Sequence, residues 1–259
     1  MSLRVATWNV NSIRTRLEHA KAWIHAKNPD IICLQETKVV NEDFPSAFFE
    51  ELGYHCHIHG QKSYNGVAFI SKKPMENVQQ GFPDGDLNGQ ARVIRGECDG
   101  VSIINLYVPQ GESVDSEKFI FKEAFYGKIM EMLQSEYDAS QDVLLCGDMN
   151  IAAAAIDVYD VEKVGVRCMF TPEEHEWLDR IKSWGMVDTF REMYPEDGGF
   201  SWWDYRQNSF ARNKGWRIDH IYVTSSLFAK AEDVAVDKGP RGVERPSDHV
   251  PVYIDLNVG

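Results

Sequence analysis

Short apolar runs that end in polar residues recur along the chain and predict the strands of buried sheets. The clearest run is Val143–Cys146, which is followed directly by Gly147-Asp148-Met149-Asn150. A continuous apolar run of this kind is typical of a strand that is covered on both faces. Similar runs predict further strands at residues 3–8, 31–34, 54–59, 66–71, 91–97, 101–108, 186–190, 218–224, 232–237 and 251–256.

Helical signals separate these strands. The apolar residues between Phe121 and Leu133 repeat at helical spacing and predict the longest helix, at residues 117–137. Thr171-Pro172-Glu173-Glu174 is a capping box with proline at the first helical position, so a second helix should begin there and end at Gly185. Two more helices are predicted at residues 17–27 and 43–52.

The order of these elements favours one architecture. Strands and helices alternate loosely, and the predicted strands at residues 54–71 and 91–108 form hairpin-like pairs. A simple doubly wound parallel sheet would lack such pairs, so we expect sheets packed face to face with helices outside. Because no low-complexity linker divides the chain, we predict one domain over residues 1–259.

Composition narrows the class of protein. Hydrophobic residues make up 43% and charged residues 26% of the 259 residues, which is ordinary for a globular protein. No apolar run approaches the ~18 residues of a membrane span. The first residues also lack the basic and apolar regions of a signal peptide. We therefore expect a cytoplasmic protein of bacterial type that does not bind membranes.

Charge and cysteine content add two constraints. The five cysteines are scattered and odd in number, so we expect reduced thiols and neither a disulfide framework nor a zinc site. The net charge of −13 argues against indiscriminate binding to polyanions. It does not exclude nucleic acid, because a site for divalent cations itself requires clustered carboxylates.

Side chains that could take part in catalysis or metal binding follow the predicted strands. Each has an ordinary interpretation as a turn former, a strand cap or a strand aromatic. Together they supply hard oxygen ligands, amide donors and a histidine near carboxylates, at strand ends where a shared cavity is expected. These positions are Asn9, Asn11, Glu36, Tyr107, Asp148, Asn150, Asp219, Asp248 and His249.

This set of side chains suits hydrolysis of a phosphate ester. Enzymes lower reaction barriers by ~8–23 kcal/mol, whereas one general base contributes only ~10²–10⁴-fold. Charge neutralisation and positioning must supply the remainder, so we expect a bound metal ion. Ligands that are mainly oxygen favour Mg²⁺ or Mn²⁺ over Zn²⁺.

The motifs, taken in order, resemble those of the exonuclease III family of apurinic/apyrimidinic (AP) endonucleases. The resemblance covers essentially the whole chain. It implies a DNase I-like, four-layered α/β sandwich in which two packed mixed β-sheets are flanked by helices. The motifs that carry it are Thr7-Trp8-Asn9-Val10-Asn11, Leu34-Gln35-Glu36-Thr37-Lys38, Tyr107-Val108-Pro109-Gln110-Gly111, Gly147-Asp148-Met149-Asn150, Trp216-Arg217-Ile218-Asp219 and Ser247-Asp248-His249-Val250-Pro251.

The resemblance implies a set of metal ligands. Glu36 corresponds to the principal ligand, and Asn9 and Asp248 would lie close to the same ion, with Asn11 in support. We count Asp148, Asn150 and His249 among the candidate ligands as well. Whether one ion or two act is left open.

The same resemblance implies catalytic roles. Asp148 would deprotonate or orient the attacking water, and Asn150 would hold both Asp148 and the phosphate. His249, oriented by Asp219, would contact the scissile phosphate. Tyr107 would assist departure of the leaving oxygen.

Substrate contacts are expected around these groups. The positions of Trp202, Trp216 and Ile218 resemble an apolar pocket for a flipped-out sugar without a base. Some of the basic residues should touch phosphates, while the others form an ordinary solvated surface. The polar candidates for substrate contact are Asn11, Lys38, Arg92, Gln110, Lys118, Lys122, Arg206, Arg212, Lys214, Arg241 and Arg245.

The expected function is therefore DNA repair. We predict a monomeric nuclease that binds double-stranded DNA, cuts 5′ to an abasic site, and has 3′–5′ exonuclease or 3′-phosphodiesterase activity. One alternative is a phosphatase of the same superfamily that acts on inositol phosphates or sphingolipids. A second is a DNA-binding relic without activity, against which the intact set of acidic residues, His249 and Tyr107 argues.

Overall fold

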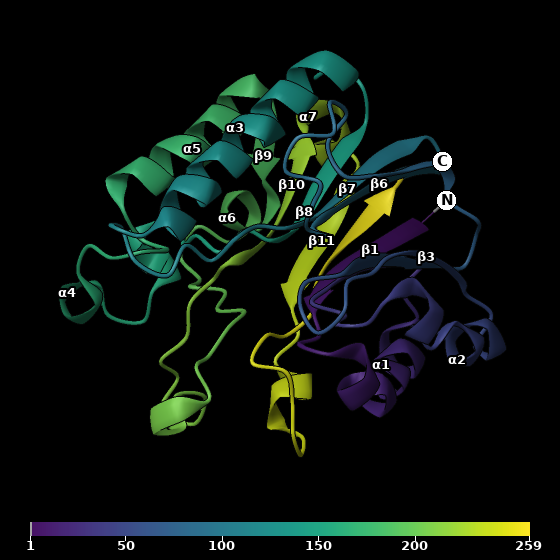
Figure 1. Cartoon of the computed structure of the whole chain (residues 1–259), viewed down its shortest axis with the longest axis horizontal. Coiled ribbons are helices and arrows are strands. Elements are labelled where there is room, and N and C mark those ends of the chain that lie inside the picture. The colour runs from purple at the N-terminus through teal and green to yellow at the C-terminus, as the bar shows by residue number, and fades with distance from the viewer. Residues whose placement is uncertain (1) are drawn as a thin grey trace.

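The apolar runs form two six-stranded sheets in the computed structural model, which describes residues 2–259 (Figure 1). The first sheet has the order β11 (Ala231–Val236), β12 (Val252–Asn257), β1 (Ser2–Asn9), β2 (Ile31–Gln35), β4 (Val67–Ser71) and β3 (His55–His59). The second has the order β5 (Glu76–Gln80), β6 (Val93–Cys98), β7 (Val101–Tyr107), β8 (Val143–Asp148), β10 (Asp219–Thr224) and β9 (Met186–Asp188).

Helices cover the outer face of each sheet (Figure 1). The α-helices are α1 (Ile13–Lys27), α2 (Ser46–Glu51), α3 (Glu117–Glu136), α4 (Val161–Val164), α5 (Pro172–Trp184), α6 (Thr189–Met193) and α7 (Ser225–Phe228). Short 3-10 turns lie at Asn41–Asp43, Ala155–Asp157, Arg206–Asn208 and Gly239–Gly242.

Three apolar clusters hold the layers together. The central cluster packs the facing sides of the two sheets, with Phe69 and Ile103 among its buried members. A second cluster packs α1 and α2 on the first sheet, and a third packs α3 and α5 on the second. The order helix, sheet, sheet, helix confirms the predicted four-layered α/β sandwich.

Strand register brings the predicted site residues to one edge of the sandwich. Asn9 lies beside Gln35 where β1 and β2 run parallel. In the second sheet, Asp148 at the end of β8 pairs with Tyr107 of β7 on one side and with Asp219 of β10 on the other. Three of the predicted site residues therefore end or begin neighbouring strands.

Some predicted boundaries are wrong for local reasons. The strand predicted at 186–190 ends at Asp188, whose side chain accepts a hydrogen bond from the Arg191 N–H and so begins helix α6. The helix predicted at 43–52 is divided by Pro45 into a 3-10 turn and α2. Strand β5 was not predicted because Glu76–Gln80 is mostly polar.

All five cysteines are free thiols, as predicted. Within residues 2–259, none of the helices combines the length and the apolar character that crossing a bilayer requires.

Candidate active site

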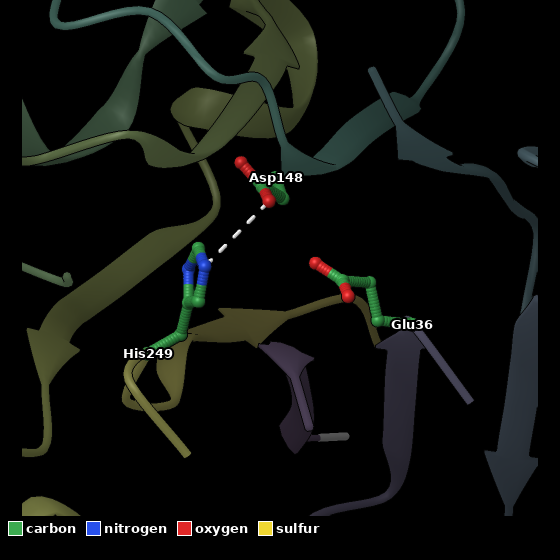
Figure 2. Close-up of side chains that lie close together, drawn as sticks. All are labelled: Glu36, Asp148 and His249. Carbon is green, nitrogen blue, oxygen red and sulfur yellow. Dashed lines mark ion pairs between the residues drawn. The ribbon is translucent and has the colours of Figure 1, made fainter. Parts of the chain in front are cut away.

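Glu36, Asp148 and His249 come together from three separate strand ends (Figure 2). One potential ligand atom from each lies within 4.8 Å of the others, and this is the one such group of acidic, histidine or cysteine side chains found among residues 2–259. Glu36 follows β2, Asp148 ends β8, and His249 precedes β12. Segments more than 200 residues apart in the chain therefore build one polar centre.

Unusual backbone conformations aim these side chains. Glu36 and Asn150 both have φ of +51°, a left-handed conformation that turns the chain sharply after the strand. Gly147 has φ of +144°, and a Cβ at that position would lie 1.9 Å from the carbonyl oxygen of Leu106 on the neighbouring strand. Glycine is therefore required immediately before Asp148.

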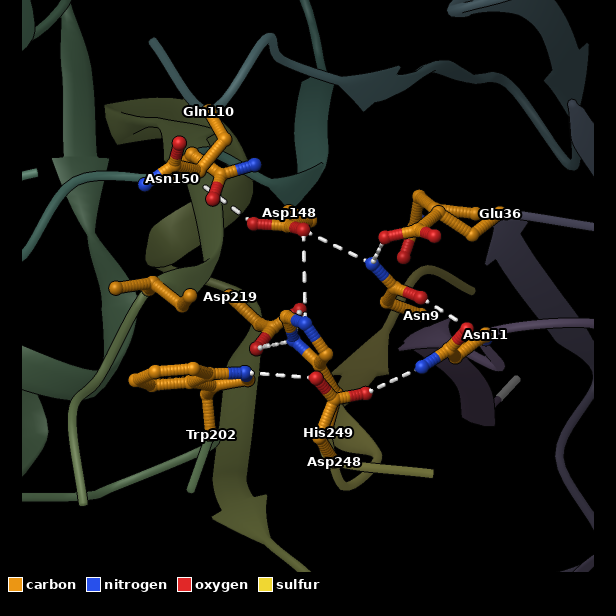
Figure 3. A network of polar contacts seen from close by, with 12 residues as sticks. Asn9, Asn11, Glu36, Gln110, Asp148, Asn150, Trp202, Asp219, Asp248 and His249 are labelled. Carbon is orange, nitrogen blue, oxygen red and sulfur yellow. Dashed lines mark hydrogen bonds and ion pairs between the residues drawn. The ribbon is translucent and has the colours of Figure 1, made fainter. Parts of the chain in front are cut away.

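Asn9 bridges the two carboxylates (Figure 3). Its Nδ2 donates to Glu36 Oε1 and to Asp148 Oδ2, both at 2.9 Å. Its Oδ1 accepts from the Asn11 N–H at 3.0 Å. In this arrangement Asn9 presents its nitrogen, and not the oxygen that a metal ligand would use, to the carboxylates.

Asp219 orients His249. The imidazole Nδ1 lies 2.9 Å from Asp219 Oδ2, which also accepts a hydrogen bond from the Ser201 hydroxyl at 2.7 Å. On the opposite side of the ring, Nε2 lies 3.7 Å from Asp148 Oδ2. The ring therefore stands between two carboxylates, and Ser201, which the sequence did not reveal, fixes one of them.

These neighbours keep the imidazole charged. Burial opposes the charged form, but the carboxylates of Asp219 and Asp148 outweigh it and raise the pKa of His249 to about 10. A protonated imidazole donates hydrogen bonds and does not bind a metal. In this form His249 can donate a hydrogen bond to a phosphate oxygen, whereas only the neutral ring could serve as the metal ligand predicted from the sequence.

Asp148 has a carboxyl group whose pKa is raised. Burial raises its pKa to about 7, with His249 acting in the opposite direction and Asp219 adding to the increase. Asp148 Oδ1 also accepts the Asn150 N–H at 3.0 Å. A carboxyl group with a pKa near neutrality is suited to accept a proton.

Tyr107 retains its proton. Burial, together with the nearby charges of Glu36 and Asp148, raises the pKa of its hydroxyl well above the usual value. The guanidinium of Arg92 lies 4.5 Å from the centre of the tyrosine ring and donates to the Tyr107 carbonyl at 3.1 Å. Arg92 therefore contacts both the ring and the backbone carbonyl of Tyr107 and helps to hold the residue in place.

Asp248 and Lys38 are held by neighbouring polar groups. Asp248 accepts one hydrogen bond from Asn11 Nδ2 at 2.9 Å and another from Trp202 Nε1 at 3.0 Å (Figure 3). Lys38 Nζ lies 2.8 Å from Glu36 Oε2 and also donates to Asn11 Oδ1. Each carboxylate oxygen of Asp248 therefore already has a donor, although Asp248 is a predicted metal ligand.

A cavity of about 800 Å³ opens over this centre. Trp216 and Ile218 form an apolar part of its wall and are 7% and 1% exposed. Ten of the predicted site residues line the cavity: Glu36, Tyr107, Gln110, Asp148, Asn150, Trp202, Trp216, Ile218, Asp248 and His249. The other five, Asn9, Asn11, Lys38, Arg92 and Asp219, lie behind that lining and contact members of it.

Basic side chains line part of the same cavity. Arg206 and Lys214 were predicted as phosphate contacts, whereas Lys163 and Arg167 were not, although the segment 161–170 was expected to border the DNA. The prediction for Lys122 is wrong. Its side chain is fully buried and forms an ion pair with Glu174, so it cannot reach a phosphate at the surface.

The donor groups at the centre fit a divalent cation. Glu36 and Asp148 present hard carboxylate oxygens on the cavity wall. Lys38 forms an ion pair with Glu36, and the Asn9 amide donates hydrogen bonds to both carboxylates. Oxygen donors of this kind suit Mg²⁺ or Mn²⁺. Glu36 also has a lowered pKa, since Lys38 and the Asn9 amide outweigh the effect of burial, so it is ionised at neutral pH.

Comparisons with known proteins agree with this picture. The model of the endonuclease/exonuclease/phosphatase family matches residues 6–249. An exodeoxyribonuclease III of Haemophilus influenzae is 38% identical, over 98% of this chain and all of that protein. The solved structure of an AP endonuclease from Archaeoglobus fulgidus has a TM-score of 0.95 and 38% identity, covering 98% of this chain and 99% of the other.

A second solved structure includes nucleic acid. It is a 3′ phosphatase, NExo, from Neisseria, bound to a product DNA hairpin. It superposes with a TM-score of 0.94 at 37% identity, covering 98% of this chain and 99% of the other. The close match over the whole fold agrees with the DNase I-like architecture expected from the sequence.

Proposed function

The chain belongs to the endonuclease/exonuclease/phosphatase family and, within it, to the exonuclease III group of AP endonucleases, and from that membership we infer that it is a DNA repair nuclease. It hydrolyses the phosphodiester bond 5′ to an abasic site and has 3′–5′ exonuclease and 3′-phosphodiesterase activity on double-stranded DNA. The observation that carries this conclusion is the cavity that places Asp148 and His249 beside the apolar wall of Trp216 and Ile218.

Glu36 and Asp148 would hold a Mg²⁺ or Mn²⁺ ion, with Asp248 near them. When bound, such an ion neutralises charge on the phosphate and lowers the pKa of water. Asn9 would have to turn its amide to offer its oxygen to the ion, because in the present orientation its nitrogen donates to both carboxylates. Glu36 is the carboxylate on which we expect metal binding to depend most.

The chain's own residues divide the remaining work. Asp148, which the Asn150 N–H holds in place, accepts the proton of the attacking water. His249 is kept protonated by Asp219, so it donates to a phosphate oxygen and stabilises the charge that develops there. Tyr107, whose hydroxyl remains protonated, donates to the departing 3′ oxygen.

The apolar wall would favour damaged DNA. A nucleotide without its base is the cheapest to flip out of a duplex, and a tight apolar pocket excludes an intact nucleotide. Trp216 and Ile218 stand in the wall within three residues of Asp219. We propose that they receive the bare sugar, and that a single copy of the chain binds the duplex.

Cleavage of a labelled duplex with one abasic site tests this function. We expect cutting at the abasic site that EDTA stops and added Mg²⁺ restores. Glu36→Gln should require a higher Mg²⁺ concentration for half-maximal rate. A parallel reaction with an inositol phosphate addresses the alternative. Phosphate release from that substrate, with the abasic duplex left intact, would overturn the proposal.

A further inference from the structure

Lys122 of α3 and Glu174 of α5 form an ion pair behind the active-site cavity. Their side chains are both 0% exposed, and Lys122 Nζ lies 2.5 Å from Glu174 Oε1. Removing two charges from water is costly, and an apolar pair of similar volume often stabilises a protein as well or better. The hydrogen bonds made by this pair indicate what it does instead.

Lys122 binds the backbone at two strand ends. Its Nζ donates to the Asn150 carbonyl at 2.7 Å and to the Gln110 carbonyl at 3.2 Å. Asn150 follows β8 and Gln110 follows β7, so one ammonium group joins the segments that leave both strands. The N–H of Asn150 in turn donates to Asp148, which links Lys122 to the proposed base through one residue.

Glu174 binds the opposite wall of the cavity. Its Oε1 accepts from the Met169 N–H at 3.0 Å, and its Oε2 accepts from the Thr171 N–H at 3.1 Å. Met169 has φ of +77°, which a residue with a side chain rarely adopts, so this part of the backbone is held in place by its surroundings. Met169 also lines the cavity and accepts a hydrogen bond from Gln110 Nε2.

Together the two side chains connect three segments of the cavity wall: residues 108–112, 148–151 and 168–171. Each segment ends or begins at a helix or strand that the apolar core already fixes. The ion pair supplies the polar contacts that the core cannot, because these segments expose carbonyl and N–H groups to the interior.

We propose that Lys122 and Glu174 are positioning residues for phosphodiester cleavage, an inference that rests on the proposed nuclease function. By fixing the Asn150 peptide, Lys122 fixes the distance between Asp148 and the phosphate. By fixing Met169, Glu174 fixes the wall that faces the bound sugar. The pair touches neither water nor DNA, and its effect passes through Asn150 and Met169.

A neutral pair of similar shape tests this role. The double variant Lys122→Met with Glu174→Gln removes both charges while keeping most of the side-chain volume. We expect kcat on an abasic duplex to fall about 100-fold, the loss typical of a misplacement of about 1 Å, while KM changes less than threefold. The single variant Lys122→Arg keeps the charge and several donors, so it should retain most of the wild-type kcat.

Met132→Ala is the matched control. Met132 is buried in the same helix, in the cluster that packs α3 on the second sheet, and lies away from the cavity wall. It should lower Tm without lowering kcat. A double variant whose kcat falls no more than that of the control would overturn the positioning role, as would a Lys122→Arg variant no faster than the neutral pair. Glu174→Gln alone is the substitute if the double variant does not fold, and the same split between kcat and KM is expected.

Cleavage by the wild-type protein distinguishes a failure of the proposed nuclease function from a failure of the positioning role. If it fails to cleave the abasic duplex, the proposed function is wrong. If it cleaves and the neutral pair cleaves equally fast, the function stands and the positioning role is refuted.

Discussion

His249 stands between the carboxylate of Asp219, which lies behind the cavity lining, and that of Asp148, which is part of the lining. Asp219 and Asp148 raise the pKa of His249, while burial raises the pKa of Asp148 against the effect of His249. Substitution of a single residue therefore changes its neighbours as well. Two predictions concern these three side chains.

The first concerns the proton acceptor. Asp148→Asn keeps the shape of the side chain but removes the base, so we expect kcat to fall by about 10²–10⁴-fold with KM nearly unchanged. Steady-state kinetics on an abasic duplex at saturating Mg²⁺ measures both constants. Losses that appear equally in binding and in turnover would show that Asp148 mainly holds the substrate.

The second concerns the His249–Asp219 pair. Because Asp219 acts by orienting and charging His249, removing either residue should remove most of the benefit of both. A double-mutant cycle with His249→Ala and Asp219→Ala should therefore show strong non-additivity in the free energy of activation. Simple addition of the two losses would refute the coupling.

The sequence predicted most of the side chains that the structure brings together around the cavity. Glu36, Asp148 and His249 were recognisable because each sits in a motif next to an apolar strand. Ser201 was not, since a serine between Phe200 and Trp202 carries no signal of its contact with Asp219. The partner of Lys122 was also hidden, because Glu174 lies 52 residues further along the chain.

At the scale of elements, buried ion pairs fasten the loop that follows β8. Arg217 donates to Asp157 in that loop and to Asp188 at the end of β9, and it is 1% exposed. Trp216 and Ile218 flank Arg217 in the chain, so the same contacts hold the apolar wall of the cavity.

Asp188 should make stability depend on pH. Burial opposes its ionisation, but Arg217 outweighs that effect and lowers the pKa of Asp188 to about 2, compared with about 3.9 when unfolded. Its stabilisation is therefore complete above the unfolded pKa and is lost as pH falls toward the folded pKa. Urea unfolding should show the wild type losing about 1 kcal/mol more than Asp188→Asn between about pH 5 and pH 3. Parallel pH profiles would contradict this.

Trp216 tests the apolar wall. Trp216→Ala enlarges the cavity beside the site without touching the charged groups, so the barrier against an intact nucleotide should fall. We expect the preference for abasic over intact duplex to relax about tenfold, with little change in trimming of a recessed 3′ end. An unchanged ratio of initial rates on the two duplexes would show that the wall does not select the substrate.

The elements themselves were partly predictable. The capping box at Thr171 and the stop at Gly185 set the bounds of α5 correctly, because local chemistry decides them. Strand β5 and the course of residues 151–171 were not predictable. The first is polar, and the second is held by Arg217, which binds Asp157, and by Glu174, which binds the Met169 N–H.

At the scale of the whole molecule, charge is distributed unevenly. The chain carries a net charge of −13, yet Lys163, Arg167, Arg206 and Lys214 all line the cavity. The chain as a whole therefore repels DNA, while these four side chains offer local positive charge beside the carboxylates that also line the cavity. The two-sheet architecture explains how this is arranged, since strand ends and loops from both sheets meet at a single edge.

The proposed reaction requires water to attack phosphorus on the 5′ side of an abasic site. The most direct test is single-turnover cleavage of an abasic duplex in water labelled with the heavy oxygen isotope, followed by mass spectrometry of both fragments. The proposed reaction should leave a 3′-hydroxyl on one fragment and a single heavy oxygen in the 5′-phosphate of the other, with no product when EDTA is present. A cut on the 3′ side that leaves an unsaturated sugar, carries no heavy oxygen and persists in EDTA would contradict it.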